Sequence, residues 1–389
     1  MKVLVINAGS TSIKFDIFDT EANMSSFFGE VKNILVGATM HLQYGVKKIE
    51  KALPIKTHQE AVPYINAYIN SLGLTFDAIG FRAVHGGSFT KHLLLDDNVL
   101  NQLKSLNPLA PLHNPITVDV IQSYRANTNK PICLVFDTVF YNSLQPLSYT
   151  YPIPKAWRDL GVRKYGFHGI SHEYLNNKVN EFGHFNRVIT CHLGAGSSIT
   201  ATLNNKPIDT SMGFTPMSGL MMATRSGDID PLIINYLMSR TNMTIEQISN
   251  SLTYDSGLQG LTGISDNKLV EIEALKGNKD CILALNMYVK KILEHISSYY
   301  LFLGGVDALV FSGGIGENSA ILRKMIVSGL GPLGFKLNEA ANNSPDKEKQ
   351  INDLGTPIYV IATNESKVIA KYTEQVIKEV MHENNKANI

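Results

Sequence analysis

Polar side chains that could act on a charged substrate stand at strand-like ends and glycine turns of this chain. Arg82 closes one apolar run, and Asp137 follows the fully apolar run 131–136. An acidic residue directly after such a strand occupies a catalytic position in open α/β sheets. Only some of these polar residues need be functional, and for Asp137 a strand-end cap is the alternative. The whole set comprises Asn7, Ser10, Ser12, Lys14, Arg82, Asp137, His168, His192, Arg225 and Glu365.

The stretch 3–18 predicts a β-hairpin whose turn faces a phosphate. An apolar strand leads into the small-residue turn 8–12, and a strand with alternating apolar residues follows. Small side chains leave the backbone N–H groups open to an anion, Ser10 and Ser12 add hydroxyl donors, and Lys14 adds a positive charge. An ordinary tight hairpin with a polar turn is the alternative.

A second stretch, 188–203, repeats this pattern of strand, glycine and serine turn, and strand. Gly-Ser-Thr-Ser-Ile in the first copy is echoed by Ala-Gly-Ser-Ser-Ile in the second. Internal repetition at this distance indicates a duplicated domain. Two domains that each offer a phosphate-binding hairpin imply a cleft between them that holds a polyphosphate.

Length and composition limit the class of protein. A chain of 389 residues fits two domains of ordinary size. Lys and Arg total 35 against 34 Asp and Glu, so no strong field attracts nucleic acid or an acidic membrane surface. The first residues have too short an apolar run for a signal peptide, and 299–311 is interrupted by glycines and Asp307, so we expect a cytoplasmic protein with small-molecule partners. Three distant cysteines argue for small core residues rather than disulfides or a metal site.

Alternating helical and strand-like patterns predict an α/β fold. Asn114 is expected as a helix N-cap, the turn-rich segment 145–169 as a domain boundary, and 342–353 as a polar surface segment. Ser312 and the glycines after it predict a strand, a glycine turn and a helix start that suit a nucleotide. Expected helices cover 58–72, 114–126, 278–303 and 365–381, and expected strands cover 78–84, 131–136, 308–311 and 357–363.

Taken together, these motifs resemble those of the acetate kinase family, which belongs to the superfamily of sugar kinases, heat-shock ATPases and actin. Their order along the chain makes the resemblance specific. The matching strings are Asn7-Ala-Gly-Ser-Thr-Ser-Ile-Lys14, Arg82-Ala-Val-His-Gly-Gly87, Leu109-Ala-Pro-Leu-His-Asn-Pro115, Phe136-Asp-Thr138, Tyr165-Gly-Phe-His-Gly169, His192-Leu-Gly194, Asp209-Thr-Ser-Met-Gly213, Thr224-Arg-Ser-Gly-Asp-Ile-Asp-Pro231, Gly313-Gly-Ile-Gly-Glu-Asn318 and Thr363-Asn-Glu365.

The resemblance implies two duplicated actin-like, ribonuclease H-like ATPase domains around a central cleft. The N-terminal domain, 1–144 with the returning helix 366–389, would hold the acyl substrate. The C-terminal domain, 145–365, would bind the nucleotide and form a homodimer. The implied reaction is reversible, Mg²⁺-dependent phosphoryl transfer between ATP and acetate, with acetyl phosphate and ADP as products and Mn²⁺ as a possible substitute for Mg²⁺.

The same resemblance implies roles in the transfer chemistry. Arg82 holds the carboxylate or acyl phosphate, while Arg225 and His168 stabilise the transferring phosphoryl group. Asp137 acts as an acid or base or as an orienting residue. Orientation is favoured because a carboxylic acid with a pKa near 4.3, about that of Glu, is already ionised at neutral pH.

Further residues are implied to bind the metal, the acyl group and the nucleotide. Asn7 and Glu365 resemble the magnesium site. Val84, Leu112, Phe167 and Pro216 match the wall of a methyl pocket, although each alone would suit an ordinary core. His85, His113 and His172 match supporting positions, with a purely structural role as the alternative. The nucleotide residues are Ser10, Ser12, Lys14, His192, Leu193, Gly194, Ala195, Gly196, Asn267, Lys268, Leu269, Gly313, Gly314, Ile315, Gly316 and Glu317.

The chain departs from the family pattern mainly on the nucleotide side. Ala195 stands where the family has Asn, Lys268 where it has Arg, and Tyr141 where it has a His. The acetate and transfer residues are intact. A relaxed nucleotide preference or pyrophosphate as donor therefore stays open, although the intact 313–318 loop argues for a nucleotide.

Other functions compete with acetate phosphorylation. Propionate or butyrate could replace acetate, since one methylene group is worth only about 1–3 kcal/mol. A non-catalytic ATP-switch protein of the same superfold needs no carboxylate clamp, so Arg82 and Arg225 argue against it. A sugar kinase would need Asp137 to deprotonate a hydroxyl group.

Overall fold

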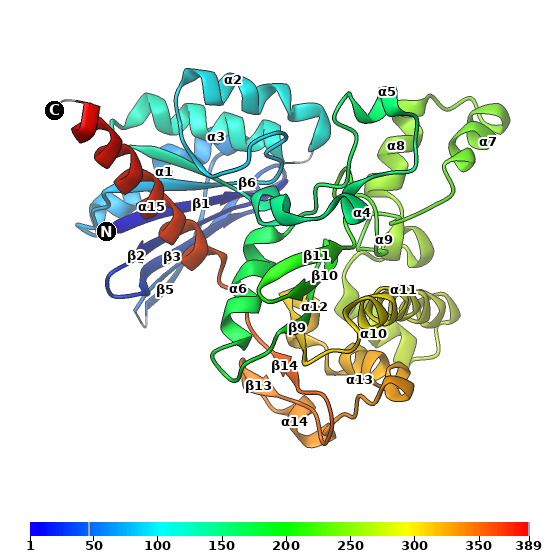
Figure 1. Ribbon diagram of the computed structural model, residues 1–389. Helices are drawn as coiled ribbons and strands as arrows, with labels where there is room; N and C mark the ends of the chain where they lie inside the picture. The colour runs from blue at the N-terminus through cyan, green and yellow to red at the C-terminus, as the bar shows by residue number, and fades with distance from the viewer. Residues whose placement is uncertain (46, 112, 388–389) are drawn as a thin grey trace. The chain divides into compact units, whose positions relative to one another are not determined.

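The computed structural model describes residues 1–45, 47–111 and 113–387 (Figure 1). The chain divides into two compact units, each built on its own β-sheet. The first comprises Met1–Asn142 with Asn364–Ile389, and the second comprises Ser143–Thr363. The mixed α/β character expected from the alternating patterns is confirmed.

The first unit contains an eight-stranded sheet in the order β5-β4-β3-β2-β1-β6-β8-β7. Strands β1 to β5 form an antiparallel meander, β1, β6 and β8 are parallel, and β7 is antiparallel to β8. The strands are β1 (Lys2–Ala8), β2 (Ile13–Asp19), β3 (Met24–Lys32), β4 (Thr39–Tyr44), β5 (Lys47–Ala52), β6 (Ala78–Ala83), β7 (Leu93–Leu94) and β8 (Ile132–Phe136).

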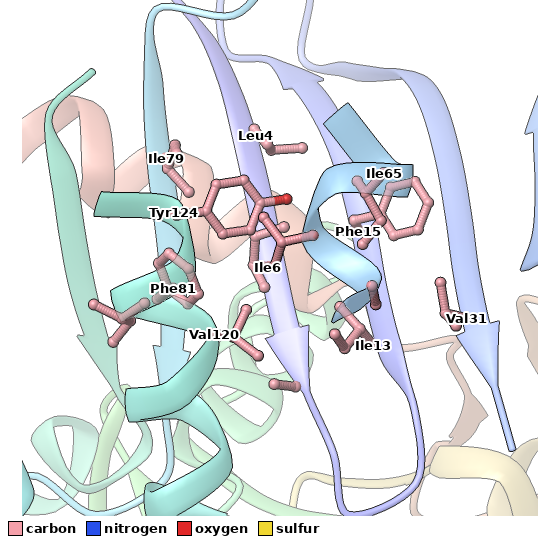
Figure 2. Close-up of a cluster of buried hydrophobic side chains, with 14 of the residues drawn as sticks. Leu4, Ile6, Ile13, Phe15, Val31, Ile65, Ile79, Phe81, Val120 and Tyr124 are labelled. Carbon is pink, nitrogen blue, oxygen red and sulfur yellow. The ribbon is translucent and has the colours of Figure 1, made fainter. Parts of the chain in front are cut away.

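Helices cover both faces of this sheet. Phe81 points to α3, where its ring lies 5.7 Å from that of Tyr124, and Figure 2 shows both rings in the core with side chains of β1 and β2. The preceding residue, Gly80, faces the opposite side. A Cβ there would lie 2.4 Å from Thr373 Oγ1 of α15, so α15 packs closely on the second face. The helices of this unit are α1 (His58–Ser71), α2 (Asp97–Ser105), α3 (Asn114–Asn127) and α15 (Glu365–Ala387), with short 3-10 turns η1 (Asn107–Leu109) and η2 (Asp137–Ser143).

The second unit contains a six-stranded sheet in the order β11-β10-β9-β12-β14-β13. The directions of its strands repeat, in the same order, those of β3-β2-β1-β6-β8-β7 in the first sheet. Both sheets have an antiparallel meander, a parallel core and an antiparallel edge strand. The repeated arrangement agrees with the duplication expected from the two hairpins. The strands are β9 (Arg187–Leu193), β10 (Ser197–Leu203), β11 (Lys206–Thr210), β12 (Ala308–Ser312), β13 (Lys349–Gln350) and β14 (Ile358–Val360).

Alternate residues of β9 face different helices. Val188 packs with α6, whereas Ile189 belongs to the core beneath α11 and α13. The helices of this unit are α4 (Pro146–Tyr149), α5 (Lys155–Arg158), α6 (Gly169–Val179), α7 (Leu232–Arg240), α8 (Ile245–Tyr254), α9 (Gly257–Thr262), α10 (Asn267–Leu275), α11 (Lys279–Leu303), α12 (Gly313–Asn318), α13 (Ala320–Gly329) and α14 (Glu339–Asn343), with the 3-10 turn η3 (Gly331–Leu333).

Two local expectations are wrong. His113 is the residue that precedes α3, and Asn114 is the first helical residue, because its buried side chain instead bonds the backbone of His85. Segment 342–353 is not simply a polar surface, because Asn342 and Ile351 are buried and 349–350 forms strand β13.

The cysteines behave as expected, since Cys133, Cys191 and Cys281 are buried free thiols. Among the helices in the described ranges, none has the length and apolar character needed to cross a bilayer.

Candidate active site

In the first unit, four predicted site residues gather where the parallel strands end. Asn7 lies near the end of β1, Arg82 near the end of β6, and Asp137 directly follows β8. Glu365 begins α15, which packs on these same strands. Carboxyl ends of parallel strands share one edge of a sheet, so residues distant in sequence meet there.

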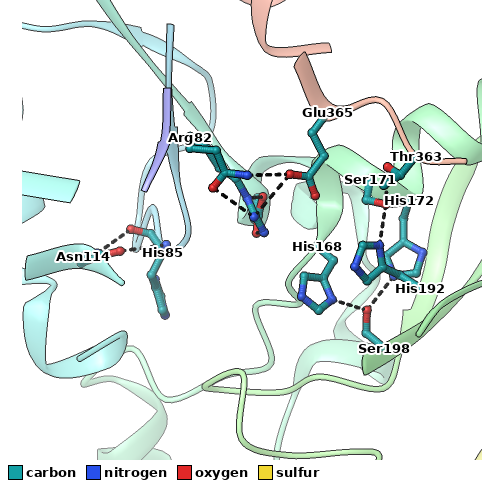
Figure 3. A network of polar contacts seen from close by, with 12 residues as sticks. Arg82, His85, Asn114, His168, Ser171, His172, His192, Ser198, Thr363 and Glu365 are labelled. Atoms are coloured by element: carbon teal, nitrogen blue, oxygen red, sulfur yellow. Dashed lines mark hydrogen bonds and ion pairs between the residues drawn. The ribbon is translucent and has the colours of Figure 1, made fainter. Parts of the chain in front are cut away.

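Arg82 is held in a fixed orientation by Asp137. Its Nε donates to Asp137 Oδ1 at 3.0 Å and its Nη2 donates to Oδ2 at 2.7 Å, a bidentate pair. The third guanidinium nitrogen, Nη1, lies 3.4 Å from Glu365 Oε2 (Figure 3). The same nitrogen lies 3.4 Å from Asn7 Oδ1. The Asp137 side chain is fully buried and that of Arg82 is 14% exposed. This geometry leaves Arg82 little freedom to rotate away.

Burial and charge act in opposite directions on Arg82. Burial alone would lower the pKa of the guanidinium, but the carboxylates of Asp137 and Glu365 outweigh it and raise the pKa of Arg82 above its ordinary value. Arg82 is therefore a permanent positive charge at this sheet edge.

The side chains of Asn7 and Glu365 carry oxygen atoms of the kind that bind a hard divalent cation such as Mg²⁺. Asn7 Nδ2 donates to Glu365 Oε2 at 2.9 Å, so the amide group of Asn7 lies beside the carboxylate, while its oxygen Oδ1 lies 3.4 Å from Arg82 Nη1. Mg²⁺ favours such oxygen ligands and completes its shell with water and phosphate oxygens. Across the described ranges, no cluster of three or more His, Cys, Asp or Glu could hold a metal by itself. The pair by itself supplies only part of the six-ligand shell of such a cation.

The glycine hairpin of the first unit has the predicted form. Gly9 N donates to Ser12 O at 2.8 Å and closes the turn, and His58 Nε2 contacts Gly9 O at 2.9 Å. Ser10 is exposed at the tip, and Lys14 is exposed on β2 directly opposite Asn7. The hydroxyl and ammonium donors expected for an anion thus lie next to the metal-binding candidates.

In the second unit, His168 lies at the start of α6 in an unusual backbone conformation. Its φ is 55°, in the left-handed region that few residues with a Cβ adopt. Its Nδ1 contacts Ser198 Oγ at 2.9 Å, and its ring centroid lies 4.4 Å from that of His192. His192 Nδ1 in turn contacts Ser171 Oγ at 2.8 Å (Figure 3). Strain of this kind is common at functional sites.

Arg225 and His168 converge on Gly196. A Cβ at Gly196 would lie 3.4 Å from both Arg225 Nη1 and His168 Nε2, so these nitrogens flank the same backbone position. Arg225 Nη1 also donates to Pro216 O at 3.1 Å. Burial lowers the pKa of Arg225. An anion brought next to this guanidinium would reverse that effect.

The two glycine segments of the second unit lie together. A Cβ at Gly313, whose φ is +76°, would lie 2.6 Å from Leu193 O, and one at Gly194 would lie 3.7 Å from Gly314 N. Glu317 Oε1 accepts from Gly313 N at 3.0 Å and from Thr363 N at 3.3 Å, so its carboxylate holds the loop in place. Ile315 and Gly316 lie in the same short helix, α12.

The start of α10 is tied to this region. Asn267 Nδ2 and Ser319 Oγ both donate to Glu271 Oε1, each at 2.5 Å. Lys268 and Leu269 follow at the helix start and are exposed, as is Ala195 at the hairpin tip. The start of α10 is therefore linked through Glu271 and Ser319 to the end of the glycine segment that forms α12.

The predicted methyl-pocket residues are apolar and buried within their own units. Val84 belongs to the first unit, and Phe167 and Pro216 to the second. Leu112 lies outside the described residues.

The sequence did not single out Ser171, Ser198 and Thr363 as functional candidates. Ser171 follows His168 by three residues, just before the candidate His172. This helical spacing puts all three side chains near one face of the helix and could have drawn attention to Ser171.

Comparisons with known proteins agree along nearly the whole chain. The model of the acetokinase family matches residues 2–371. The chain is 41% identical over 401 aligned positions to an acetate kinase of Thermoanaerobacterium thermosaccharolyticum, with 97% of the chain and 99% of the relative covered. It is 39% identical to an acetate kinase of Helicobacter hepaticus, with 98% and 100% covered.

Solved structures give the same result. A propionate kinase from Francisella tularensis has a TM-score of 0.92 at 35% identity and covers 96% of this chain and 99% of its own. An acetate kinase from Porphyromonas gingivalis has a TM-score of 0.87 at 32% identity, with 97% and 99% covered.

Proposed function

Because this chain belongs to the acetokinase family, we propose that it catalyses reversible phosphoryl transfer between ATP and acetate. An acetate oxygen attacks the γ-phosphorus in line, the bond to the β-γ bridging oxygen breaks, and acetyl phosphate and ADP result. We propose that this protein acts in the cytoplasm. The single observation that carries the proposed acceptor is the buried Arg82–Asp137 pair at the sheet edge.

The chemical obstacle in this reaction is repulsion between anions. Acetate is already ionised at neutral pH, so the attacking oxygen needs no strong base. Arg82 binds the carboxylate in this scheme, and Asp137 orients the guanidinium through its two hydrogen bonds. The apolar residue Val84, two positions along the chain, suits a short acyl group.

The second unit supplies the donors for the transferring group. Arg225 and His168, which converge on Gly196, stabilise the charge that spreads over the phosphoryl oxygens. The glycine segments 192–196 and 313–317 let the backbone approach the nucleotide closely.

Mg²⁺ fits the amide and carboxylate oxygens of Asn7 and Glu365, with phosphate oxygens and water as further ligands. When bound, such an ion neutralises charge on the phosphates. Arg82 lies close to both Asn7 and Glu365. Because its guanidinium occupies part of the space around their oxygens, it limits the number of protein ligands that the ion can have.

We further propose a homodimer formed through the second unit. Helix α7 has no buried residue, and its exposed apolar side chains include Leu232 at 67% and Tyr236 at 60% exposure. An apolar helix face of this kind is typical of an interface. Light scattering coupled to size-exclusion chromatography tests it: a dimer is expected, and Tyr236→Glu with Leu232→Glu should give a monomer.

A hydroxamate assay for acyl phosphate tests the activity. Acetate, propionate, butyrate and glucose are each incubated with ATP, GTP or pyrophosphate. We expect acyl phosphate from acetate with ATP at the highest kcat/KM. The absence of acyl phosphate from every short acid would reject the kinase function. If acyl phosphate forms only with pyrophosphate, then pyrophosphate rather than a nucleotide is the phosphoryl donor.

A further inference from the structure

We propose that Arg323 positions the glycine segment 313–317 for the nucleotide by holding the last carbonyl groups of α12. This inference rests on the proposed function, in which that segment binds ATP and ADP. Arg323 lies on α13, between α12 and α14 in the chain (Figure 1), and all three helices belong to the second unit. Its hydrogen bonds go to the protein itself, so it is a positioning residue.

The short helix α12 ends on carbonyl groups that need partners from outside the helix. The last carbonyls of any α-helix lack backbone N–H donors further along the same helix, and α12 has only six residues. Ser319 N donates to Ile315 O at 2.9 Å. The next two carbonyls, of Gly316 and Glu317, accept from Arg323 Nη1, each at 2.9 Å. A cation at this end also suits the direction of the peptide dipoles.

The rest of the Arg323 guanidinium is anchored to α14. Its Nε donates to Asn342 Oδ1 at 2.8 Å, and its Nη2 donates to Asn342 O at 2.8 Å. Asn342 Nδ2 in turn donates to Ala320 O at 2.9 Å, at the start of α13. Arg323 and Asn342 are both almost completely buried. Because the guanidinium is planar, these contacts leave one orientation, in which Nη1 faces the end of α12.

All four of these bonds from Arg323 end on neutral oxygens. Burial lowers the pKa of Arg323 to about 10, although the carboxylate of Glu271 opposes this effect, so the guanidinium stays charged at neutral pH. Burying a charge among neutral groups is costly. An apolar side chain would avoid that cost, but it could not bind the carbonyls of α12. The arginine is therefore explained by the contacts that it makes to this helix.

The other end of the glycine segment is held by Glu317. Its Oε1 accepts from Gly313 N at 3.0 Å and from Thr363 N at 3.3 Å. Glycines give this backbone a conformational freedom that must be restrained by neighbouring groups. With both ends held, the segment keeps one arrangement before the nucleotide binds. Nucleotide affinity is then not reduced by time that the segment spends in other arrangements.

A purely structural role of Arg323 is the competing explanation. Its loss would then lower the fraction of folded protein, so kcat per total protein would fall while the KM values stayed the same. In the positioning role, the folded protein keeps its kcat at saturating ATP, and KM rises for ATP but not for acetate. The two explanations therefore differ in which kinetic constant changes.

Nucleotide binding tests the positioning role through Arg323→Lys. Lysine keeps the charge, but its single nitrogen cannot reproduce the planar fork that joins α12 to α14. We expect KM for ATP and the dissociation constant of ADP to rise about tenfold, as when the segment is competent about a tenth of the time. KM for acetate should stay nearly constant. Steady-state kinetics and calorimetric titration with ADP and Mg²⁺ measure these constants, and an unchanged ADP affinity would overturn the proposal.

A second variant and a matched control separate this contact from general weakening of α13. Asn342→Ala keeps Arg323 but removes the acceptor of its Nε, so ADP affinity should fall by a smaller factor. If only this variant folds, an unchanged ADP affinity in it overturns the proposal. The control is Ile326→Ala, because Ile326 is completely buried on α13 in the apolar core. Its ADP affinity should match that of the unmodified chain, and a loss equal to that of Asn342→Ala would also overturn the proposal.

Hydrogen exchange of backbone amides tests the same contact without a ligand. Arg323→Lys should speed exchange in the segment 313–319, because the end of α12 is no longer held. Exchange in β9, at 187–193, should not change. Ile326→Ala is again the control for general weakening of α13. Equal exchange of the segment 313–319 in Arg323→Lys and the unmodified chain would contradict the positioning role.

Failure of the proposed function gives a different result. If the unmodified chain binds ADP but makes no acyl phosphate, the proposed reaction fails, and ADP binding still tests Arg323. If acyl phosphate forms and Arg323→Lys binds ADP as tightly as the unmodified chain, only the positioning role fails.

Discussion

The corresponding edges of the two sheets carry different groups, although the strand order and directions repeat. At the ends of β6 and β8, the first unit presents Arg82 and Asp137. At the ends of β12 and β14, the second unit presents the glycines from Gly313 onward and the segment 361–363. A small carboxylate needs a fixed charge, whereas a nucleotide needs close approach of backbone, and one repeated scaffold can provide either.

The two candidate arginines show the same contrast. Arg82 is compensated by two carboxylates, which raise its pKa against the effect of burial. Arg225 donates to a carbonyl oxygen and to the sulfur of Met222, and burial lowers its pKa. We infer that Arg82 contributes to both folding and substrate binding, while Arg225 contributes mainly when a phosphate is present.

The largest expected effect is on stability, at the Arg82 edge. Asp137→Ala leaves a buried guanidinium with part of its charge uncompensated, which should lower the free energy of unfolding by about 3–5 kcal/mol. Denaturant unfolding measures it. The control is Asp159→Ala, which breaks an exposed pair with Lys155 and should cost at most about 1 kcal/mol. If Asp137→Ala and Asp159→Ala lower the free energy of unfolding equally, the buried Arg82–Asp137 pair is no more important for stability than an exposed pair.

Arg225 should show the reverse behaviour. Arg225→Ala should lower kcat by at least about a hundredfold, because a donor to the developing charge is lost. Its free energy of unfolding should fall by less than about 2 kcal/mol, since its hydrogen bonds to the Pro216 carbonyl and the Met222 sulfur are to neutral groups. Steady-state kinetics and denaturant unfolding on the same preparation measure both. Near-normal turnover would exclude Arg225 from stabilising the transition state.

Acid should weaken the first unit through His92. Burial lowers the pKa of His92 to about 4, and its Nδ1 accepts from the N–H of Phe136, the residue before Asp137. The unfolded chain therefore binds this proton at higher pH than the folded chain does. The free energy of unfolding should fall as pH decreases from about 6.5 to about 4, by up to about 3 kcal/mol from this residue.

Unfolding curves at a series of pH values test this dependence. His92→Asn keeps a hydrogen-bond acceptor but does not titrate, so its stability should change less steeply with pH. His184→Asn changes an exposed histidine and is the control. Identical slopes for His92→Asn and the unmodified chain would exclude His92 as the cause.

The smallest expected effect lies at the tip of the second hairpin. Ala195 is exposed there, and Ala195→Asn adds an amide that can bond the nucleotide. One such hydrogen bond is worth about 0.5–1.5 kcal/mol, so KM for ATP should fall by about two- to tenfold with little change for acetate. Ala195→Leu, of similar size but apolar, should not reproduce the decrease. An unchanged KM in Ala195→Asn would show that this tip does not limit nucleotide affinity.

The long elements could be predicted because their patterns are local. Helices α1 and α11 and both glycine hairpins follow from apolar spacing and turn residues. The short edge strands β7 and β13 could not be predicted, because two residues carry no periodic pattern. Asn114 is not the N-cap that an asparagine before a proline predicts, because its side chain makes a tertiary hydrogen bond to the backbone of His85.

The sequence by itself determined the strand-end residues, the repeated hairpins and the family, because these depend on residue types and their order. Only the tertiary structure decided that Arg82 pairs with Asp137 and Glu365, and that Ser198 and His172 form the hydrogen-bonded surroundings of His168. Such partners come from separate strands and helices. Their hydrogen bonds depend on sheet register and helix packing, which no local pattern encodes.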